Sequence, residues 1–386
     1  MSTATEKSLG PGSTRGTRRV VHLTSVHPPD DIRIFQKECA ALADAGYDVT
    51  LIAPADAEAR CGRVRVKMIP KPRGRLERMT VTTARLLWAA IRSRAELVHV
   101  HDPELLPCLN VLRALGKRVV FDMHEDTPMS LSTREWISTV IRSPVARLYK
   151  LLERVLLTGI PVVFAADSLA AAYPWVSEGT MVRNYPILRQ LLQLSEPLYP
   201  TPTITYVGAV TRQRGSVRVL DAVAECWRQG VHVDLEYVGM ISEVHRQELL
   251  GRVPRLKSGE VRILGYLEPI RAWQHAARAH IGIAVLEPLP NYVGSLATKL
   301  LEYMALGKPV ICSNMPLYTK LVEGAVCGIC VDPTDTGAIA NAIRHMLSHP
   351  AEAALLGTRG REVVKNGYDW ELESRKLIAL YDRLLQ

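Results

Sequence analysis

Short runs of β-branched and other apolar residues alternate with amphipathic helical segments along almost the whole chain. Repeated strand–helix–strand units of this kind are typical of parallel sheets that helices cover on both faces. In the first half we expect strands at residues 20–23, 49–53, 97–101, 119–121 and 162–165. Between the first two of these strands we expect a helix over residues 34–45, with Gly46 as its stop. In the second half we expect them at residues 204–207, 233–238, 261–264, 281–286, 310–312 and 329–331. The pattern therefore predicts an α/β protein.

A proline-rich segment separates the two halves of the chain. Pro197, Pro200 and Pro202 fall within six residues, which excludes regular structure there. A chain of 386 residues is also long for a single core. We therefore predict two doubly wound, Rossmann-like domains that face a cleft. The expected boundaries are a flexible tail at 1–19, a first domain at 20–195, a linker at 196–202 and a second domain at 203–369.

The composition excludes several classes of protein. With 47% hydrophobic and 23% charged residues the chain is an ordinary globular one. It has no apolar run of about 18 residues that would span a membrane, and no apolar leader at the start. Seven scattered cysteines suit a reducing cytoplasm. The Cys327–Cys330 pair lacks a second pair at ligand spacing, so we expect a buried turn and strand there rather than a zinc site.

The net charge of +9 is concentrated in two stretches. Between residues 61 and 94 there are ten Lys or Arg residues and one acid, Glu77. A second basic stretch, residues 134–154, also carries apolar residues at near-helical spacing: Trp136, Ile137, Val140, Ile141, Leu148, Leu151 and Leu152. Such a pattern is typical of a helix on an anionic membrane surface. Nucleic acid is a weaker candidate because no aromatic-rich binding platform is present; a solvated basic face without a partner is the other alternative. We expect a cytoplasmic protein, peripheral at the inner face of the cell membrane.

Residues 298–310 hold the most specific motif of the chain. A polar start, a short apolar helix, a stop at Gly307 and a strand led by Pro309 follow one another. Glu302 lies in that helix among apolar neighbours, so we expect it to be at least partly buried. A buried carboxylate needs partners, and the hydroxyls of a sugar or ribose are suitable ones. The alternative is a surface glutamate on a half-buried helix.

A second motif follows the first strand of the second half. Gly208 and Gly215 enclose Arg212 and Arg214, and a helical pattern comes next. The start of a helix and an arginine side chain both bind phosphate oxygens well, so the combination suits a diphosphate. A glycine-rich turn with solvent-facing arginines is the alternative.

Three polar loops follow strands of the first half, where ligands bind in sheets of this kind. They offer His27 and Asp31, then His101 and Asp102, then His124 and Glu125. We favour hydrogen bonding to a sugar or to a transferring oxygen. Helix capping by His27 or Arg33, and structural histidines, remain alternatives.

The sequence gives little reason to expect a metal at these loops. Two histidines at i and i+2 on a strand, His99 and His101, are a weak metal signature, and no Asp-x-Asp occurs in the chain. We therefore expect no metal and no cofactor.

With these motifs in place, the chain resembles the family 4 glycosyltransferases of the GT-B fold over essentially its whole length. The resemblance implies a retaining transfer of a hexose-type sugar from a UDP- or GDP-linked donor to an acceptor hydroxyl. A lipid-linked or surface-polysaccharide intermediate is the expected acceptor. The nucleotide sugar would be a co-substrate.

The resemblance also assigns roles to residues. Glu302 matches the second glutamate of the family's Glu-x7-Glu motif, which binds the ribose, and Arg214 matches the basic residue that grips the diphosphate. His124 matches the histidine that contacts the transferred sugar. Residues 370–386 resemble the helix that crosses back onto the first domain. The expected donor-binding set is Gly208, Arg212, Arg214, Gly215, Gly265, Ser295, Thr298, Lys299 and Glu302.

Two departures concern the donor sugar. The first glutamate of the motif is Gly294 here, so backbone N–H groups of residues 291–298 with Ser295 or Thr298 would hold the sugar. The usual arginine after the first glycine of the phosphate loop is Ala209, and Arg212 would replace it. A non-catalytic nucleotide-sugar-binding subunit, or a same-fold epimerase or phosphorylase, is therefore kept as an alternative.

Overall fold

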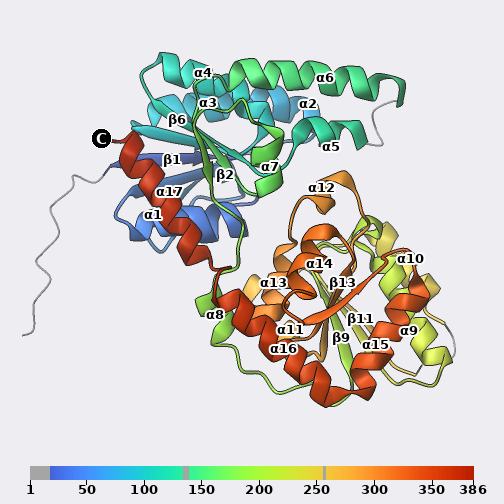
Figure 1. The fold of residues 1–386 in the computed structure, drawn as a ribbon. Coiled ribbons are helices and arrows are strands. Elements are labelled where there is room, and N and C mark those ends of the chain that lie inside the picture. Colours follow the sequence, from blue (N-terminus) through green and yellow to red (C-terminus); the bar gives the residue numbers. More distant parts are fainter. Residues whose placement is uncertain (1–17, 134–138, 255–257) are drawn as a thin grey trace, which may run out of the picture. The chain divides into compact units, whose positions relative to one another are not determined.

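The protein is described by a computed structural model, which covers residues 18–133, 139–254 and 258–386. Two mainly parallel sheets form its framework (Figure 1). The first has the strand order β3-β4-β2-β1-β5-β6-β7-β8, with β1 Arg19–Leu23, β2 Asp48–Pro54, β3 Ala59–Cys61, β4 Val64–Ile69, β5 Leu97–Val100, β6 Arg118–Met123, β7 Val162–Phe164 and β8 Gly179–Met181. The second has the order β11-β10-β9-β12-β13-β14, with β9 Thr203–Val207, β10 Asp234–Val238, β11 Val261–Gly265, β12 Ile281–Ala284, β13 Val310–Ser313 and β14 Gly328–Val331. The predicted α/β class with two sheets is confirmed.

Helices connect the strands throughout. Those up to residue 192 are η1 Ile32–Cys39, α1 Ala40–Asp44, α2 Arg75–Glu77, η2 Arg78–Thr82, α3 Thr83–Arg92, η3 Pro103–Leu105, α4 Leu106–Ala114, α5 Thr127–Thr133, α6 Thr139–Leu156, α7 Asp167–Ala172 and α8 Leu188–Leu192. Those after residue 203 are η4 Arg212–Arg214, α9 Ser216–Arg228, α10 Glu243–Arg252, α11 Pro269–Arg278, α12 Pro290–Val293, α13 Thr298–Ala305, α14 Pro316–Val322, α15 Thr336–Ser348, α16 Pro350–Lys365 and α17 Trp370–Leu384. Within the described ranges, none of these helices combines the length and apolar character needed to cross a bilayer.

By its internal contacts the chain divides into two compact units, residues 1–120 with 382–386, and residues 121–381. The division falls inside β6. In the first unit, the Tyr47 hydroxyl donates to Asp382 over 2.7 Å, which ties the end of the chain to this unit. Residues 196–202 lie between the last strand of the first sheet and the first strand of the second. The predicted domain boundaries and cleft stay predictions.

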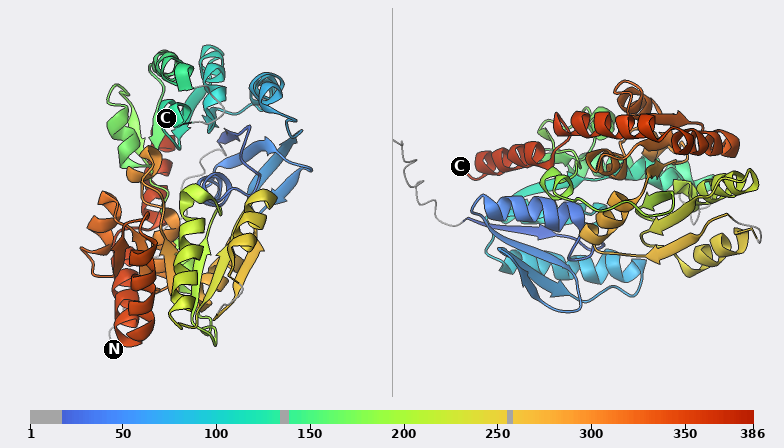
Figure 2. Two further views of the ribbon diagram at one scale, coloured as in Figure 1. Left: turned by 90° about the vertical axis from the view of Figure 1, so that its right-hand side faces the viewer. Right: turned by 90° about the horizontal axis from the view of Figure 1, so that it is seen from below.

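The second sheet is covered by helices on both faces (Figures 1 and 2). One face packs against α9, α10 and α15 through a cluster that includes Tyr206, Tyr237 and Ile343. The other face packs against α11, α13 and α14 through residues such as Trp273 and Tyr303. All residues of β9, β10, β12 and β13 are buried, as expected for strands covered on both sides. The edge strands β11 and β14 are partly exposed, so burial on both faces is complete only in the interior of the sheet.

Every strand that we predicted is present with its ends shifted by at most two residues, but three strands were missed. These are β3, β4 and β8. In β4 the buried Val64 and Val66 alternate with the exposed Arg65 and Lys67, which is a clear strand pattern. These residues also belong to the basic stretch at 61–94, whose charge conceals the strand in the sequence.

The predicted single helix over residues 34–45 is wrong in detail. The segment begins as the π-helix η1 at Ile32 and continues as the short helix α1. Asp31 caps it, because one carboxylate oxygen accepts from the N–H groups of Arg33 and Ile34, each over 2.9 Å. The capping role that we considered for His27 or Arg33 therefore belongs to Asp31. The amphipathic pattern is typical of an α-helix and gave no sign of the π-helical register.

Candidate active site

Three neighbouring strands of the second sheet end at glycines with positive φ. Gly208, Gly239 and Gly265 follow or close β9, β10 and β11, with φ of 107°, 151° and 73°. They are joined by two backbone bonds of 2.8 Å, from Gly208 N–H to the Val238 carbonyl and from Gly239 N–H to the Gly265 carbonyl. A Cβ added at Gly239 would lie 2.0 Å from the Gly208 carbonyl oxygen. Glycine is therefore required for these loops to approach each other at the carboxyl end of the sheet.

Tyr206 of β9 contacts both ends of the predicted phosphate loop, residues 208–215. Its hydroxyl lies 3.0 Å from the carbonyl oxygens of Ala209 and Arg214, at the two ends of the loop. Gly215 has φ of 80°, and an added Cβ there would lie 1.7 Å from the Val285 carbonyl oxygen. The loop is thus pinned to both β9 and the segment after β12, immediately before α9 begins at Ser216.

The two predicted phosphate-binding arginines have different surroundings. The Arg214 guanidinium lies 5.8 Å from the centre of the Tyr292 ring, and a Cβ at Gly208 would lie 3.9 Å from its Nη1. It therefore lies over the start of the loop. Arg212 is exposed and forms an ion pair with Glu248 of α10. Its predicted contact with phosphate stays a prediction that requires this pair to open.

Helix α13 places a buried lysine and a buried glutamate next to this loop. Lys299 and Glu302 are only 7% and 8% exposed, so the predicted burial of Glu302 is confirmed. The Lys299 ammonium lies 3.7 Å above the Tyr206 ring. Burial lowers the pKa of Lys299 well below its usual value, nearby Arg214 lowers it further, and Glu302 opposes both. An anionic ligand beside Arg214 would favour the charged form of Lys299.

The start of α13 is fixed by hydroxyl groups. The Tyr318 hydroxyl accepts from the Ala297 N–H over 3.1 Å, and the Thr298 hydroxyl donates to the Asn184 carbonyl over 3.2 Å. Ser295 donates to the Asn291 carbonyl over 3.3 Å. Gly294, which replaces the expected glutamate, directly follows α12. The loop that we expect to hold the donor sugar is therefore held by one hydrogen bond of its own and by two to residues outside it.

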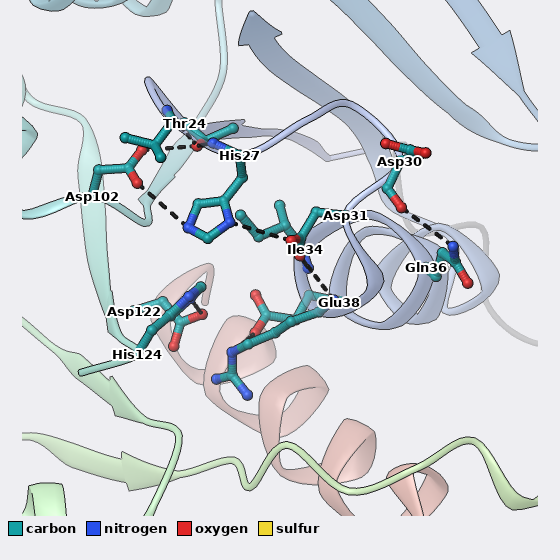
Figure 3. Close-up of polar contacts among 12 residues, drawn as sticks. Thr24, His27, Asp30, Asp31, Ile34, Gln36, Glu38, Asp102, Asp122 and His124 are labelled. Atoms are coloured by element: carbon teal, nitrogen blue, oxygen red, sulfur yellow. Dashed lines mark hydrogen bonds and ion pairs between the residues drawn. The ribbon is translucent and has the colours of Figure 1, made fainter. Parts of the chain in front are cut away.

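In the first unit, the loop after β1 meets the end of β5 through His27 (Figure 3). The imidazole lies between two carboxylates, with Nδ1 3.2 Å from Asp31 and Nε2 3.6 Å from Asp102. Thr24 links Asp102 to the backbone of His27, since its hydroxyl donates to Asp102 over 2.8 Å and accepts from the His27 N–H over 2.9 Å. Three of the predicted residues are thereby brought together.

Asp102 is the centre of this group. It is 2% exposed, and one of its oxygens accepts from the Ser25 N–H over 2.6 Å as well as from Thr24. His101, the preceding residue, is also buried but turns to His22 of β1, with 2.9 Å between the two ring nitrogens. Asp102 is therefore well placed to fix His27, whereas His101 belongs to a different group of side chains.

The remaining predicted pair lies in the second unit. His124 follows β6 and its Nε2 lies 2.6 Å from a carboxylate oxygen of the fully buried Asp122. This contact fixes the orientation of the imidazole. Glu125 is exposed and accepts from the Ser130 hydroxyl over 3.0 Å.

Several residues of these sites were not predicted. Tyr206, Tyr292 and Tyr318 support the phosphate loop, Arg214 and the start of α13, and Asp122 orients His124. The position of Asp122 two residues before His124 on a strand puts both side chains on one face, and this spacing could have identified it. The tyrosines gave no comparable signal, because an aromatic residue near a strand end is usually part of a core.

Comparison with known proteins identifies the kind of protein to which the chain is similar. A family model described as glycosyl transferases group 1 matches residues 201–349, and a model of glycosyltransferase family 4 matches residues 34–172. The phosphatidyl-myo-inositol mannosyltransferase of Mycolicibacterium smegmatis is 23% identical over 360 residues, which cover 88% of this chain and 86% of that protein. The O-antigen chain mannosyltransferase B of Escherichia coli is 28% identical over 130 residues, 33% of this chain and 32% of that protein.

Solved structures show the same fold. Sucrose-phosphate synthase from Thermosynechococcus elongatus aligns over 95% of this chain and 99% of its own, with a TM-score of 0.74 at 20% identity. The Anabaena protein HepE, in complex with UDP and glucose, aligns over 95% of this chain and 100% of its own, with a TM-score of 0.71 at 15% identity.

The two sheets and these structural matches show the GT-B fold. The two family models, which together match most of the chain, make the assignment more specific. The chain belongs to glycosyltransferase family 4.

Proposed function

We propose that the protein transfers a hexose-type sugar from a UDP- or GDP-linked donor to an acceptor hydroxyl, with retention of the anomeric configuration. The observation that carries this proposal is the group formed by Arg214, Lys299 and Glu302 at the carboxyl end of the second sheet. Arg214, together with Lys299 in the charged form that a bound anion favours, suits a diphosphate, and a buried carboxylate suits ribose hydroxyls. Further support comes from HepE, which was solved with UDP and glucose, and from the mannosyltransferases among the relatives.

The main catalytic contribution of this group is electrostatic. As the bond from the sugar C1 to the diphosphate breaks, the leaving diphosphate gains negative charge. Arg214 and the starts of α9 and α13 stabilise that charge in a preorganised way, and Arg212 adds to them once its ion pair with Glu248 opens. Since these groups supply the positive charge, added Mg²⁺ or Mn²⁺ leaves the rate unchanged.

The proton and the stereochemistry follow from the same arrangement. A phosphate oxygen of the leaving diphosphate takes the proton of the acceptor hydroxyl, and the new C1–O bond forms on the face that the diphosphate leaves. No carboxylate is assigned as a covalent nucleophile. His124, held by Asp122, orients the transferred sugar, and Glu302 holds the ribose hydroxyls.

The acceptor side is proposed to work at an anionic membrane surface with a lipid-linked or surface-polysaccharide intermediate. Helix α6 exposes an apolar stripe at helical spacing: Ile141, Val145, Leu148, Leu151, Leu152 and Val155, each between 37% and 63% exposed. Arg142, Arg147, Lys150 and Arg154 flank the stripe, and the acid of this segment, Glu153, is buried. Exposed apolar side chains beside basic ones suit the interface of an anionic bilayer. Arg134, Trp136 and Ile137 and the side chain of Val140 lie outside the described residues.

The first unit presents a second surface of the same character. Leu76, Met79, Val81 and Trp88 of the segment α2–η2–α3 are between 44% and 81% exposed. Arg92 lies against the Trp88 ring, with its guanidinium carbon 4.6 Å from the ring centre. Two relatives are named as phosphatidyl-myo-inositol mannosyltransferases, which act on a lipid acceptor by name and support this part of the proposal.

The experiment that tests the proposal is a screen of nucleotide sugars by thermal shift, because a bound donor raises the unfolding temperature by mass action. The stabilising donor is then incubated with lipid extract, and the anomeric configuration of the product is determined by NMR. We expect stabilisation by one class of UDP- or GDP-sugar and a product with the configuration of the donor. A product of inverted configuration, or a chain that no nucleotide sugar stabilises, contradicts the proposal.

One observation favours a second candidate, a non-catalytic nucleotide-sugar-binding subunit. The first glutamate of the family motif is replaced by Gly294, so one side chain expected at the donor sugar is missing. Calorimetric binding of a donor without turnover on any acceptor would support this candidate. Release of a changed sugar without acceptor would instead indicate an epimerase or phosphorylase.

A further inference from the structure

Four buried side chains with metal-binding atoms converge in the first sheet, outside the group formed by His27 and Asp102. They are His22 of β1, Glu38 of η1, and His99 and His101 at the end of β5. One ring nitrogen or carboxylate oxygen from each lies within 4.8 Å of the corresponding atom of every other. His22, Glu38 and His99 are 0% exposed and His101 is 3% exposed.

The strands determine why the three imidazoles meet. His22 and His99 are register partners in the parallel pairing of β1 with β5. His101 lies two residues beyond His99, so both side chains point to the same face of the sheet. The ring centres are 4.7 to 5.1 Å apart, and Nδ1 of His22 lies 2.9 Å from Nε2 of His101. The nitrogens therefore converge.

The π-helix supplies the carboxylate. In η1 the Gln36 N–H bonds to the Asp31 carbonyl five residues earlier, over 3.1 Å. This register also aligns residues 33 and 38, and the Arg33 guanidinium Nε lies 3.1 Å from Oε1 of Glu38. A carboxylate has two oxygens, so it can accept from an arginine and bind a cation at once. A second partner of this kind commonly orients a metal ligand, and π-helical turns are frequent at functional sites.

We propose that His22, Glu38, His99 and His101 bind one divalent transition-metal ion of the zinc type. Three imidazoles and one carboxylate form a four-coordinate donor set typical of Zn²⁺, whereas Mg²⁺ and Ca²⁺ prefer oxygen ligands. Tetrahedral coordination at zinc distances places ligand atoms about 3.3 Å apart, between the 2.9 Å contact and the 4.8 Å limit seen here. Small side-chain rotations suffice to reach it.

The ion has a structural role in this proposal. His101 immediately precedes Asp102, and His22 lies two residues before Thr24. Binding one ion joins β1, β5 and η1 close in sequence to Thr24 and Asp102, the two residues that hold His27. The inference does not depend on which sugar donor or acceptor the protein uses. It needs all four side chains, because His99 and His101 alone are a weak metal signature.

Cobalt binding tests the site, because tetrahedral Co²⁺ shows intense visible absorption and octahedral Co²⁺ does not. The full-length chain without an affinity tag is freed of metal by a chelator, dialysed and titrated with CoCl₂. We expect one equivalent with the tetrahedral spectrum, displaced by one equivalent of ZnCl₂. The substitutions His99→Gln and Glu38→Gln should each weaken binding by about 100-fold or more, since each removes a ligand rather than a supporting group.

A matched control exists on the surface. His345, His349 and Glu352 also form a group with metal-binding spacing, but all three are exposed. The double variant His345→Gln/His349→Gln should keep the tetrahedral spectrum. Loss of the spectrum in this control, an octahedral spectrum only, or equal cobalt affinity of the wild type and the Glu38→Gln variant overturns the proposal.

A folding control separates loss of a ligand from loss of structure. Circular dichroism and the unfolding temperature are recorded for each variant with and without ZnCl₂. The proposal expects Zn²⁺ to raise the unfolding temperature of the wild type and not that of Glu38→Gln, which keeps the shape of the side chain. If His99→Gln does not fold, Glu38→Gln alone decides, and a zinc-induced rise of the same size in that variant contradicts the proposal.

Discussion

At the scale of single residues, Arg214 is the side chain on which the proposed chemistry depends most. It lies over the start of the phosphate loop, next to Tyr292. A charge-assisted hydrogen bond contributes about 1.5–3 kcal/mol, so Arg214→Ala should slow turnover by roughly 10- to 100-fold. The measurement is kcat with the donor identified in the screen. Arg218→Ala removes an exposed arginine of α9 as a control, and equal losses in both variants would show that only net charge matters.

Gly215 allows a second prediction at this scale. Gly215→Ala introduces a Cβ that would lie 1.7 Å from the Val285 carbonyl oxygen, a backbone atom that cannot rotate away. Gly230 has nearly the same φ, 78° against 80°, and no atom within 4 Å of an added Cβ. Both substitutions carry the cost of a left-handed residue, about 1–3 kcal/mol.

The comparison isolates the steric contact. In urea unfolding, Gly215→Ala should lose clearly more stability than Gly230→Ala, and only Gly215→Ala should weaken donor binding. Equal losses of stability in the two variants, with donor affinity unchanged, would mean that the loop can move away from Val285 and is not pinned as described.

The sequence predicted the burial of a charged residue where its neighbours are apolar. Glu302 stood out as a carboxylate among apolar neighbours, and it is buried. Lys299 was predicted at the donor, but its burial above Tyr206 was not, because a lysine at the start of a helix is normally solvated. Glu38 was missed altogether. Its environment depends on the π-helical register and on two strands that are distant in the sequence, and neither can be read from local spacing.

At the scale of elements, α6 combines an exposed apolar stripe with one buried acid. Glu153 is 1% exposed, and burial raises its pKa to about 7, with a further rise from Asp126 and opposing effects of Tyr173 and Lys150. In the unfolded chain, a glutamate side chain has a pKa near 4.3. Between these values the folded state binds more protons, so this group makes the free energy of unfolding fall as pH rises from about 4.5 to 7.

The substitution Glu153→Gln tests this sign. It should raise the free energy of unfolding by about 1–3 kcal/mol at pH 8 and change it little at pH 4.5, because the amide resembles the protonated acid. Urea unfolding of both proteins at the two pH values gives the comparison. A gain of equal size at both pH values would show that the effect is not one of protonation.

Elements with a simple burial pattern were predictable and the others were not. Strands buried on both faces, such as β9 and β13, consist mostly of apolar and β-branched residues and were all found. Strand β4 was missed because it lies near the edge of its sheet, with exposed residues that are mostly charged. The segment that forms η1 and α1 was predicted as one α-helix, since its amphipathic pattern and its stop at Gly46 are those of any α-helix.

At the scale of the whole molecule, the alternation of strands and helices was enough to predict two α/β sheets. The same architecture does not determine which donor and acceptor the protein uses or whether it binds a membrane. These properties depend on side chains at loops and surfaces. The basic stretches gave the membrane hypothesis, and α6 supplies the exposed leucines that it needs.

Vesicle binding tests that hypothesis. Leu148→Asp/Leu151→Asp replaces two side chains, each 60% exposed, and should weaken binding to anionic vesicles by about 100-fold or more, since each buried leucine contributes about 1.5–3 kcal/mol. Flotation with and without phosphatidylglycerol measures it. Leu355→Asp/Leu372→Asp, a pair 49% and 44% exposed elsewhere, is the control. Binding that is indifferent to anionic lipid, or that both variants reduce equally, argues against α6 as the contact.

The most direct measurement of the central claim is calorimetric titration of UDP and GDP into the wild type and Glu302→Ala. Because Glu302 is proposed to bind the ribose, the variant should bind the preferred nucleotide about 10- to 100-fold more weakly. Glu323→Ala, an exposed glutamate that follows α14, should bind like the wild type. Unchanged nucleotide affinity and unchanged turnover in Glu302→Ala would contradict the account.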